Sequence, residues 1–173
     1  MFKKNNLGFS LLEILIYVSI IAIVISVISG VFLSLAQGQA KADARAEINS
    51  NVRFALDKIN QDILSASAIA TPAAAGDVSN GSLIMTISPT TVTYCVVNGQ
   101  VRRSAGGTCN SSAEPITSST VKVDSLTFTR LGNTNTILSK TIVSIQTVLT
   151  ISYNGTSSNY QSAITKQITS SLR

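Results

Sequence analysis

The sequence predicts an α+β fold in which one long N-terminal helix packs on an antiparallel β-sheet. Three observations lead to this expectation. A charge-free apolar run occupies residues 14–39. A helical apolar stripe then continues through residues 48–63. From Ser82 onward, Thr, Ser, Val and Ile dominate in stretches of strand length. The 173 residues suit a single globular domain with one additional element.

A single membrane-spanning helix is expected near the N-terminus. No charged residue occurs from Ile14 to Gln39, and this stretch exceeds the roughly 20 residues that a helix needs to cross a bilayer. Lys3 and Lys4 precede it, while the four charges at positions 41–47 cancel one another. Because cytoplasmic flanks carry the excess of basic residues, we expect the N-terminus in the cytoplasm and the rest of the chain outside it.

Beyond the span, an amphipathic helix is expected over residues 40–66. Its apolar residues recur at spacings of three and four and therefore share one stripe: Ile48, Val52, Ala55, Leu56, Ile59 and Ile63. Arg53 with Asp57, and Lys58 with Asp62, are opposite charges four residues apart, which favours one continuous helix. The stripe is the natural cover for the apolar face of a sheet.

The remaining chain predicts a linker followed by a β-rich globular head. Residues 67–81 are rich in Ala, Gly and Pro and are expected to be the linker, and residues 82–173 are expected to form the head. Alternating apolar and polar residues over 143–153 predict a sheet covered on one side. The candidate strands are Leu83–Ser88, Thr91–Val97, Gln100–Arg103, Val121–Arg130, Val143–Tyr153 and Tyr160–Leu172.

Two local features predict details of this sheet. Asn98-Gly99 lies between two candidate strands and is the strongest short signal for a tight hairpin turn. In VKVDSLTFTR the apolar alternation changes phase after Val123. This change predicts a β-bulge near Asp124 and Ser125.

The composition leaves little from which to build an active site. The chain has no His, no Trp and two Cys. Without His, the commonest acid–base group and the common zinc sites are missing. Asp57 and Asp62 are not closely spaced on one helix face, so they are poor candidates for paired catalytic carboxylates. We therefore expect that the protein is not an enzyme and that it holds neither a metal nor another cofactor.

Cys95 and Cys109 lie in the polar region beyond the span. If this region is exported, an even number of cysteines predicts one disulfide. A loop of roughly 15 residues closed in this way contributes about 3 kcal/mol. In a reducing compartment the same residues would remain two free thiols.

The residues directly before the span are the most distinctive in the chain. KKNNLGFSLLEILI places Gly at position 8, an aromatic residue at 9 and an acid at 13. An ordinary secretory signal would carry its cleavage site after the apolar run instead. The passage resembles the class III leader of type IV prepilins and secretion pseudopilins. This resemblance implies that a prepilin peptidase removes residues 1–8 by cutting between Gly8 and Phe9, that it methylates the new amine of Phe9, and that residues 9–39 form a transmembrane and assembly helix.

Glu13 is an acid at the edge of an apolar helix, where a charge is costly and usually has a partner. If subunits stack with staggered helices, the free amine of an incoming Phe9 can meet Glu13 of a neighbour, which neutralises both charges and fixes the axial register. The alternative is a Glu13 side chain that reaches the cytoplasmic headgroups. The leader residues in register with it favour the assembly role.

Gly30 interrupts the apolar helix, in which Gly costs about 1 kcal/mol relative to Ala. Subunits of the family that the leader resembles often carry a helix breaker near this position, which implies local melting of the helix on assembly. Close packing of small residues against a neighbouring helix explains Gly30 equally well.

The head extends the resemblance. RFALDKINQDILSAS, TYCVVNGQVRRS, VDSLTFTR and YQSAITKQITSSLR are similar to segments of the J-type minor pseudopilins of type II secretion and the W-type minor pilins of type IV pili. The resemblance implies a pilin-like fold and a minor structural subunit of a fimbrium or pseudopilus. Its partners would be other pilins or pseudopilins and an inner-membrane assembly platform. Subunits of this kind begin in the inner membrane and end in a periplasmic or extracellular filament. The acid at Glu13 argues against the K-type tip subunit, and the mid-domain cysteine pair differs from that of a major pilin.

Two other functions are weighed against this one. A signal-anchored exported binding domain would stay monomeric in the membrane. A filament-tip subunit that captures DNA would need the basic residues beyond Ser65 on one surface with aromatic residues among them. Those residues are Arg102, Arg103, Lys122, Arg130, Lys140, Lys166 and Arg173. The net charge is only +5, and +3 without Lys3 and Lys4, so a solvated, mildly basic surface is favoured over a nucleic-acid site.

Overall fold

A computed structural model describes residues 10–135, 140–155 and 162–172. It contains one long N-terminal helix, α1 (Leu11–Ser65), followed by nine strands. Internal contacts divide the chain between Lys41 and Ala42 into two units. The first unit holds the N-terminal part of α1, and the second holds the rest of α1 with all the strands. The α+β, pilin-like fold expected from the sequence is confirmed.

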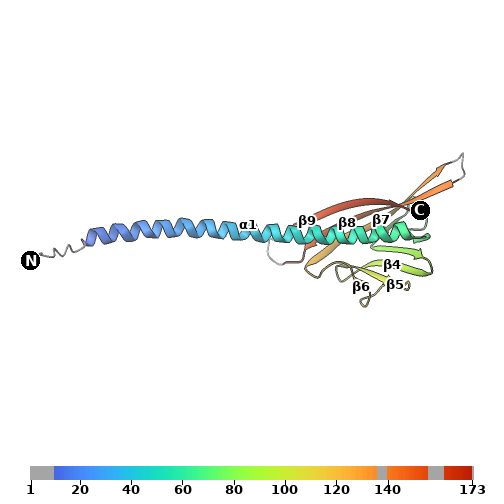
Figure 1. Cartoon of the computed structure of the whole chain (residues 1–173), viewed down its shortest axis with the longest axis horizontal. Helices are drawn as coiled ribbons and strands as arrows, with labels where there is room; N and C mark the ends of the chain where they lie inside the picture. Colours follow the sequence, from blue (N-terminus) through green and yellow to red (C-terminus); the bar gives the residue numbers. More distant parts are fainter. Residues whose placement is uncertain (1–9, 136–139, 156–161, 173) are drawn as a thin grey trace, which may run out of the picture. The chain divides into compact units, whose positions relative to one another are not determined.

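The strands form two antiparallel sheets (Figure 1). The strand bounds are β1 Ala68–Thr71, β2 Val78–Asn80, β3 Ser82–Ile87, β4 Thr90–Val97, β5 Gln100–Ala105, β6 Glu114–Pro115, β7 Val121–Asn135, β8 Lys140–Tyr153 and β9 Ala163–Ser171. The first sheet has the order β1-β3-β4-β5-β6, and the second has the order β2-β7-β8-β9. Backbone hydrogen bonds from Gly81 N to Leu126 O and from Val123 N to Gly99 O connect the two sheets.

Both local features predicted for the sheet are present. Val97 pairs with Gln100, so Asn98 and Gly99 are the two turn residues between β4 and β5. Their φ angles are 54° and 72°, and this left-handed conformation is the one that an Asn-Gly hairpin turn requires. The register of β7 against β8 shifts between Val123 and Ser125, which confirms the bulge.

Three strands, β1, β2 and β6, were not predicted from the sequence. Residues 67–81 were expected to be a linker, but they contain β1 and β2. β6 is two residues long and pairs with β5 through Pro115 and Glu114. Because these strands are short and rich in small or polar residues, they carry no alternation to recognise. β7 and β8 extend past the bounds expected for them, and the expected start of the last strand at Tyr160 lies outside the described residues.

The core of the second unit lies between α1 and the two sheets. Residues 42–65 of α1 run along the strands in Figure 1. The apolar stripe of the helix is buried, as expected, against side chains from both sheets, among them Tyr94 of β4 and Phe128 of β7. In β8, Ile145, Leu149 and Ile151 are fully buried. Of the residues between them, Gln146, Val148 and Thr150 are half-buried and Thr147 is buried. The second sheet therefore has one face against the core.

We expect Ile59→Ala to lower the free energy of unfolding of the second unit by about 2–5 kcal/mol, because Ile59 is completely buried and its truncation leaves a cavity. Phe54→Ala is the matched control, since Phe54 lies on the same helix with 58% of its surface exposed. Thermal unfolding of the full chain in detergent micelles measures both. Equal destabilisation by the two substitutions contradicts the packing described.

Candidate functional site

The first unit presents apolar side chains on every face of α1. Large apolar residues between Leu11 and Leu35 are all exposed. Because successive residues of a helix are turned by about 100°, such a run leaves no polar side. In the described part of the chain, α1 is the helix long and apolar enough to cross a membrane. This surface needs a cover of lipid or of other apolar helices.

The serine hydroxyls that have hydrogen bonds within this run are bonded to its own backbone. Ser19 donates to Ile16 O at 2.8 Å, and Ser29 donates to Ile25 O at 2.8 Å. Such bonds satisfy a hydroxyl without water, as a segment in hydrocarbon requires.

Glu13 is the charged residue of this apolar segment. It lies in the first turn of α1, where its backbone N–H donates to Ser10 O at 3.0 Å, and its side chain is exposed. A carboxylate at a helix N-terminus is favoured by the helix dipole. In the described part of the chain, no Lys or Arg side chain lies within 4.0 Å of it. Gly8 and Phe9 themselves lie outside the described residues.

Gly30 lies inside α1 without an interruption of the helix. A Cβ added at Gly30 would meet no atom within 4 Å, so no close approach within the chain requires glycine here. The local melting of the helix at Gly30 that was predicted concerns the assembled state, and it stays a prediction.

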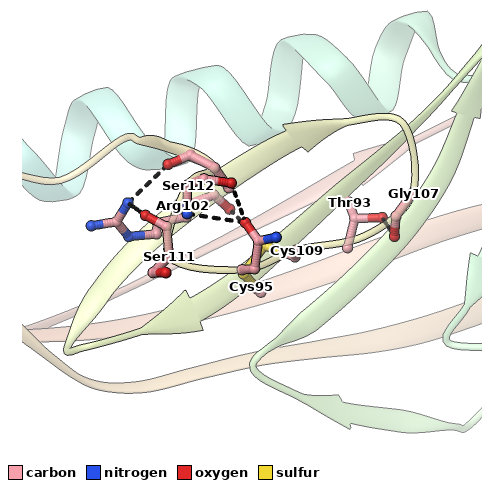
Figure 2. The surroundings of a disulfide bond; sticks show 9 residues. Thr93, Cys95, Arg102, Gly107, Cys109, Ser111 and Ser112 are labelled. Carbon is pink, nitrogen blue, oxygen red and sulfur yellow. Dashed lines mark hydrogen bonds between the residues drawn. A yellow bond between two sulfur atoms is a disulfide. The ribbon is translucent and has the colours of Figure 1, made fainter.

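The second unit contains the Cys95–Cys109 disulfide, as predicted (Figure 2). It joins β4 to the segment after β5 across a sequence separation of 14. Arg102 Nη1 donates to Ser111 O at 2.7 Å and to Ala113 O at 2.9 Å. Thr93 Oγ1 donates to Gly107 O at 2.9 Å. Residues 107–113, the segment around Cys109, are thus also held to both strands of the hairpin.

A buried polar cluster joins α1 to the first sheet. The Asp62 carboxylate accepts a hydrogen bond from the Tyr94 hydroxyl and another from Arg103 Nε, each at 2.7 Å. Lys58 approaches the other carboxylate oxygen at 4.0 Å. Arg103 is therefore the main partner of Asp62, rather than the Lys58 expected from helix spacing.

The cluster changes the proton affinity of two of its members. Burial raises the pKa of Tyr94 far above its usual value, and the hydrogen bond to Asp62 raises it further. Burial alone would lower the pKa of Arg103, but the hydrogen bond and charge of Asp62 outweigh burial and raise it. The charged Asp62–Arg103 pair and the neutral phenol are therefore a stable combination.

Three of the arginines considered for a DNA surface are engaged inside the fold. Arg102 binds the carbonyl groups of Ser111 and Ala113, and Arg103 is paired with Asp62. Arg130 Nη1 donates to the carbonyl groups of Ile69, Pro72 and Ala73 at 2.9–3.1 Å. These guanidinium groups donate to protein acceptors, and the Asp62 carboxylate balances the charge of Arg103. Within residues 10–135, 140–155 and 162–172, no group of three or more Cys, Asp or Glu side chains could hold a metal ion.

Sequence reasoning missed the Asp62 cluster. One signal was available, because Asp62 stands directly beside Ile63 within the buried arc of the helix. A charge in that position is rarely buried without a partner. Its partner Arg103 is 41 residues away and was considered only as a surface charge.

The N-terminal segment matches a known family model. Residues 3–34 match the prokaryotic N-terminal methylation motif. No curated protein and no solved structure matches the chain. The motif, together with the apolar helix that follows it, supports a type IV pilin-like protein.

We expect the stability of the second unit to fall as the pH rises above about 10, the usual pKa of a tyrosine. The folded chain keeps Tyr94 neutral because its pKa is raised, so the stabilisation is complete below that pH and is lost where the phenol ionises in the unfolded chain. Urea unfolding of the full chain in detergent, measured between about pH 8 and 11, tests this. Tyr94→Phe should flatten the dependence. An unchanged slope in that variant contradicts the assignment.

Proposed function

We propose that the chain is a minor structural subunit of a type IV pilus or a type II secretion pseudopilus. The observation that carries the proposal is an apolar helix exposed on every face, with one acid in its first turn, directly within a prokaryotic methylation motif. The subunit enters the inner membrane with its N-terminus in the cytoplasm. It then leaves the bilayer by joining other pilins or pseudopilins at the assembly platform.

Processing prepares the subunit for assembly. The prepilin peptidase hydrolyses the peptide bond between Gly8 and Phe9, and the amine of Phe9 is then methylated. Removal of residues 1–8 also removes Lys3 and Lys4, so a leader that would keep the N-terminus on the cytoplasmic side is lost. The methylated amine still carries a positive charge at neutral pH.

Glu13 supplies the complementary charge. It lacks a cationic partner in the described part of its own chain, and it is four residues from the new N-terminus. A pair between Glu13 and the Phe9 amine of a neighbouring subunit removes two isolated charges from an apolar environment. Because only one stagger brings these groups together, the pair fixes the axial position of the incoming subunit.

A monomeric, membrane-anchored binding domain is the second candidate. It requires the membrane helix but neither cleavage after Gly8 nor an acid at position 13. The methylation motif favours the filament subunit over this alternative.

Co-expression with a prepilin peptidase tests the proposal. Intact-mass and N-terminal analysis should show a chain that begins at Phe9 and carries one added methyl group, whereas Gly8→Leu should leave residues 1–8 attached. An intact N-terminus in the unsubstituted chain supports the anchored monomer instead.

Glu13→Leu separates processing from assembly. This variant should still be cleaved, but its incorporation into filaments should fall by about tenfold or more, because an unpaired amine is then left in an apolar environment. Ile14→Leu is the control, since it changes a neighbouring apolar side chain without a change of charge. Incorporation of the Glu13→Leu chain at the unsubstituted level rules out the pairing.

A further inference from the structure

β9 is an edge strand of the second sheet. The strand order is β2-β7-β8-β9, so β8 pairs with one side of β9, and no described residue pairs with its other side. Leu172 N donates to Val143 O at 2.9 Å, one step beyond the last paired residues of this ladder. Hydrogen-bonded pairs recur at every second residue of an antiparallel ladder, so the even-numbered residues of β9 are bonded to β8. The backbone N–H and C=O groups that point to the open side are those of Thr165, Gln167 and Thr169.

Lys166 lies on the face of β9 that is directed toward the core. It pairs in register with Leu149, which is fully buried, and directly paired residues place their side chains on the same face. The neighbours of Lys166 on this face, Ile164 and Ile168, are half-buried and pack against the core. The alternation of β9 therefore provides an apolar position in the middle of the strand, and a lysine occupies it.

The Lys166 ammonium group has no polar partner within the residues that the structure describes. No acid lies within 4.0 Å of it, and it makes no hydrogen bond there. Its side chain is half-buried, so the group reaches water beside the open edge. A charge directed inward on an edge strand is one of the devices that keep sheet edges from pairing with other strands, because an added strand would bury it.

A strand added to the open side would meet Lys166 at close range. The backbone of Lys166 is bonded to β8, so in a second ladder this residue falls in a non-hydrogen-bonded pair. In such pairs the Cα atoms are about 4.5 Å apart and the side chains are closest. An apolar side chain opposite Lys166 would cover the charge without balancing it, and another lysine would repel it. A carboxylate in the same place would form an ion pair with it.

We propose that β9 accepts an added strand that carries a carboxylate opposite Lys166, and that Lys166 excludes a second copy of β9. β9 itself contains no acid, so two copies paired at their centres would bring two lysines together without a counter-charge. The partner that fits this edge is an extended segment in which β-branched residues surround one Asp or Glu. The inference goes beyond the proposed function, because residues 163–171 take no part in leader cleavage or in the pairing of Glu13.

A mixture of two charge variants tests the selection of an acid. The unsubstituted chain and the Lys166→Glu chain, each uncleaved and in single-copy lipid nanodiscs, should both stay monomeric in sedimentation velocity at up to about 100 µM, because like charges meet at the paired edges. An equimolar mixture should associate at least about tenfold more strongly than either chain alone, because opposite charges then face each other. A mixture that associates no more than its components overturns the proposal.

Lys166→Ile tests the exclusion of a second β9. This chain should pair with itself, because the charge is gone and the row from Ile164 to Ile168 becomes continuous. Lys122→Ile is the matched control: Lys122 is exposed on β7, which β8 separates from β9, so this chain should stay monomeric.

A second substitution assigns the pairing to the edge of β9. Gln167→Pro removes an N–H group from the open side and leaves the ladder with β8 intact, since proline is tolerated on an edge strand where its nitrogen faces solvent. The Lys166→Ile, Gln167→Pro chain should therefore be monomeric again. A monomeric Lys166→Ile chain, equal pairing of the Lys122→Ile chain, or undiminished pairing of the double variant contradicts the proposal.

Discussion

The apolar side chains of residues 11–35 have no polar side on which the helix could face water. Each Å² of apolar surface left in water costs roughly 25 cal/mol, so a run of this length cannot stay uncovered. A bilayer covers it, and so does a ring of neighbouring helices of the same kind. Transfer from the first cover to the second keeps the apolar surface buried throughout, and it leaves the charges at the end of the helix as the groups that must find new partners.

In the proposed assembly, Glu13 is the residue at which membrane anchoring and filament formation meet. A fully apolar helix would gain no hydrophobic free energy by moving from lipid to a contact with neighbouring helices, because lipid tails are as apolar as leucine. An acid in the first turn breaks this balance if the second environment provides a cation and the first does not. In the proposed filament the cation is created by cleavage, so processing and polymerisation are coupled through one charge pair.

The second unit satisfies its polar groups in a different way. Asp62, Tyr94 and Arg103 form a closed cluster between the helix and the first sheet, and Arg102 and Arg130 bind backbone carbonyl groups of loops. Three of its arginines are thus structural.

Features encoded by neighbouring residues could be predicted from the sequence, and features that depend on distant partners could not. The Asn98-Gly99 turn and the bulge after Val123 are local, because turn conformation and side-chain alternation are set within a few residues. β1 pairs with β3, and β2 pairs with β7. These pairings could not be predicted from the sequences of β1 and β2 alone. Asp62 was recognised as one member of a helical ion pair, but its main partner came from a strand 41 residues away. The processing and assembly roles of Gly8, Phe9 and Glu13 come from a resemblance carried by one short segment, and they stay predictions.

The ionisation state of Glu13 in assembled filaments tests the charge pair most directly. The chain has only three Glu residues, so filaments that contain ¹³C-labelled glutamate give an infrared spectrum in which Glu13→Gln identifies the contribution of position 13. If Glu13 is paired with the methylated amine of Phe9, the difference spectrum shows an ionised carboxylate at neutral pH. A protonated acid carbonyl band at that position would instead mean that Glu13 is buried as a neutral group without the amine.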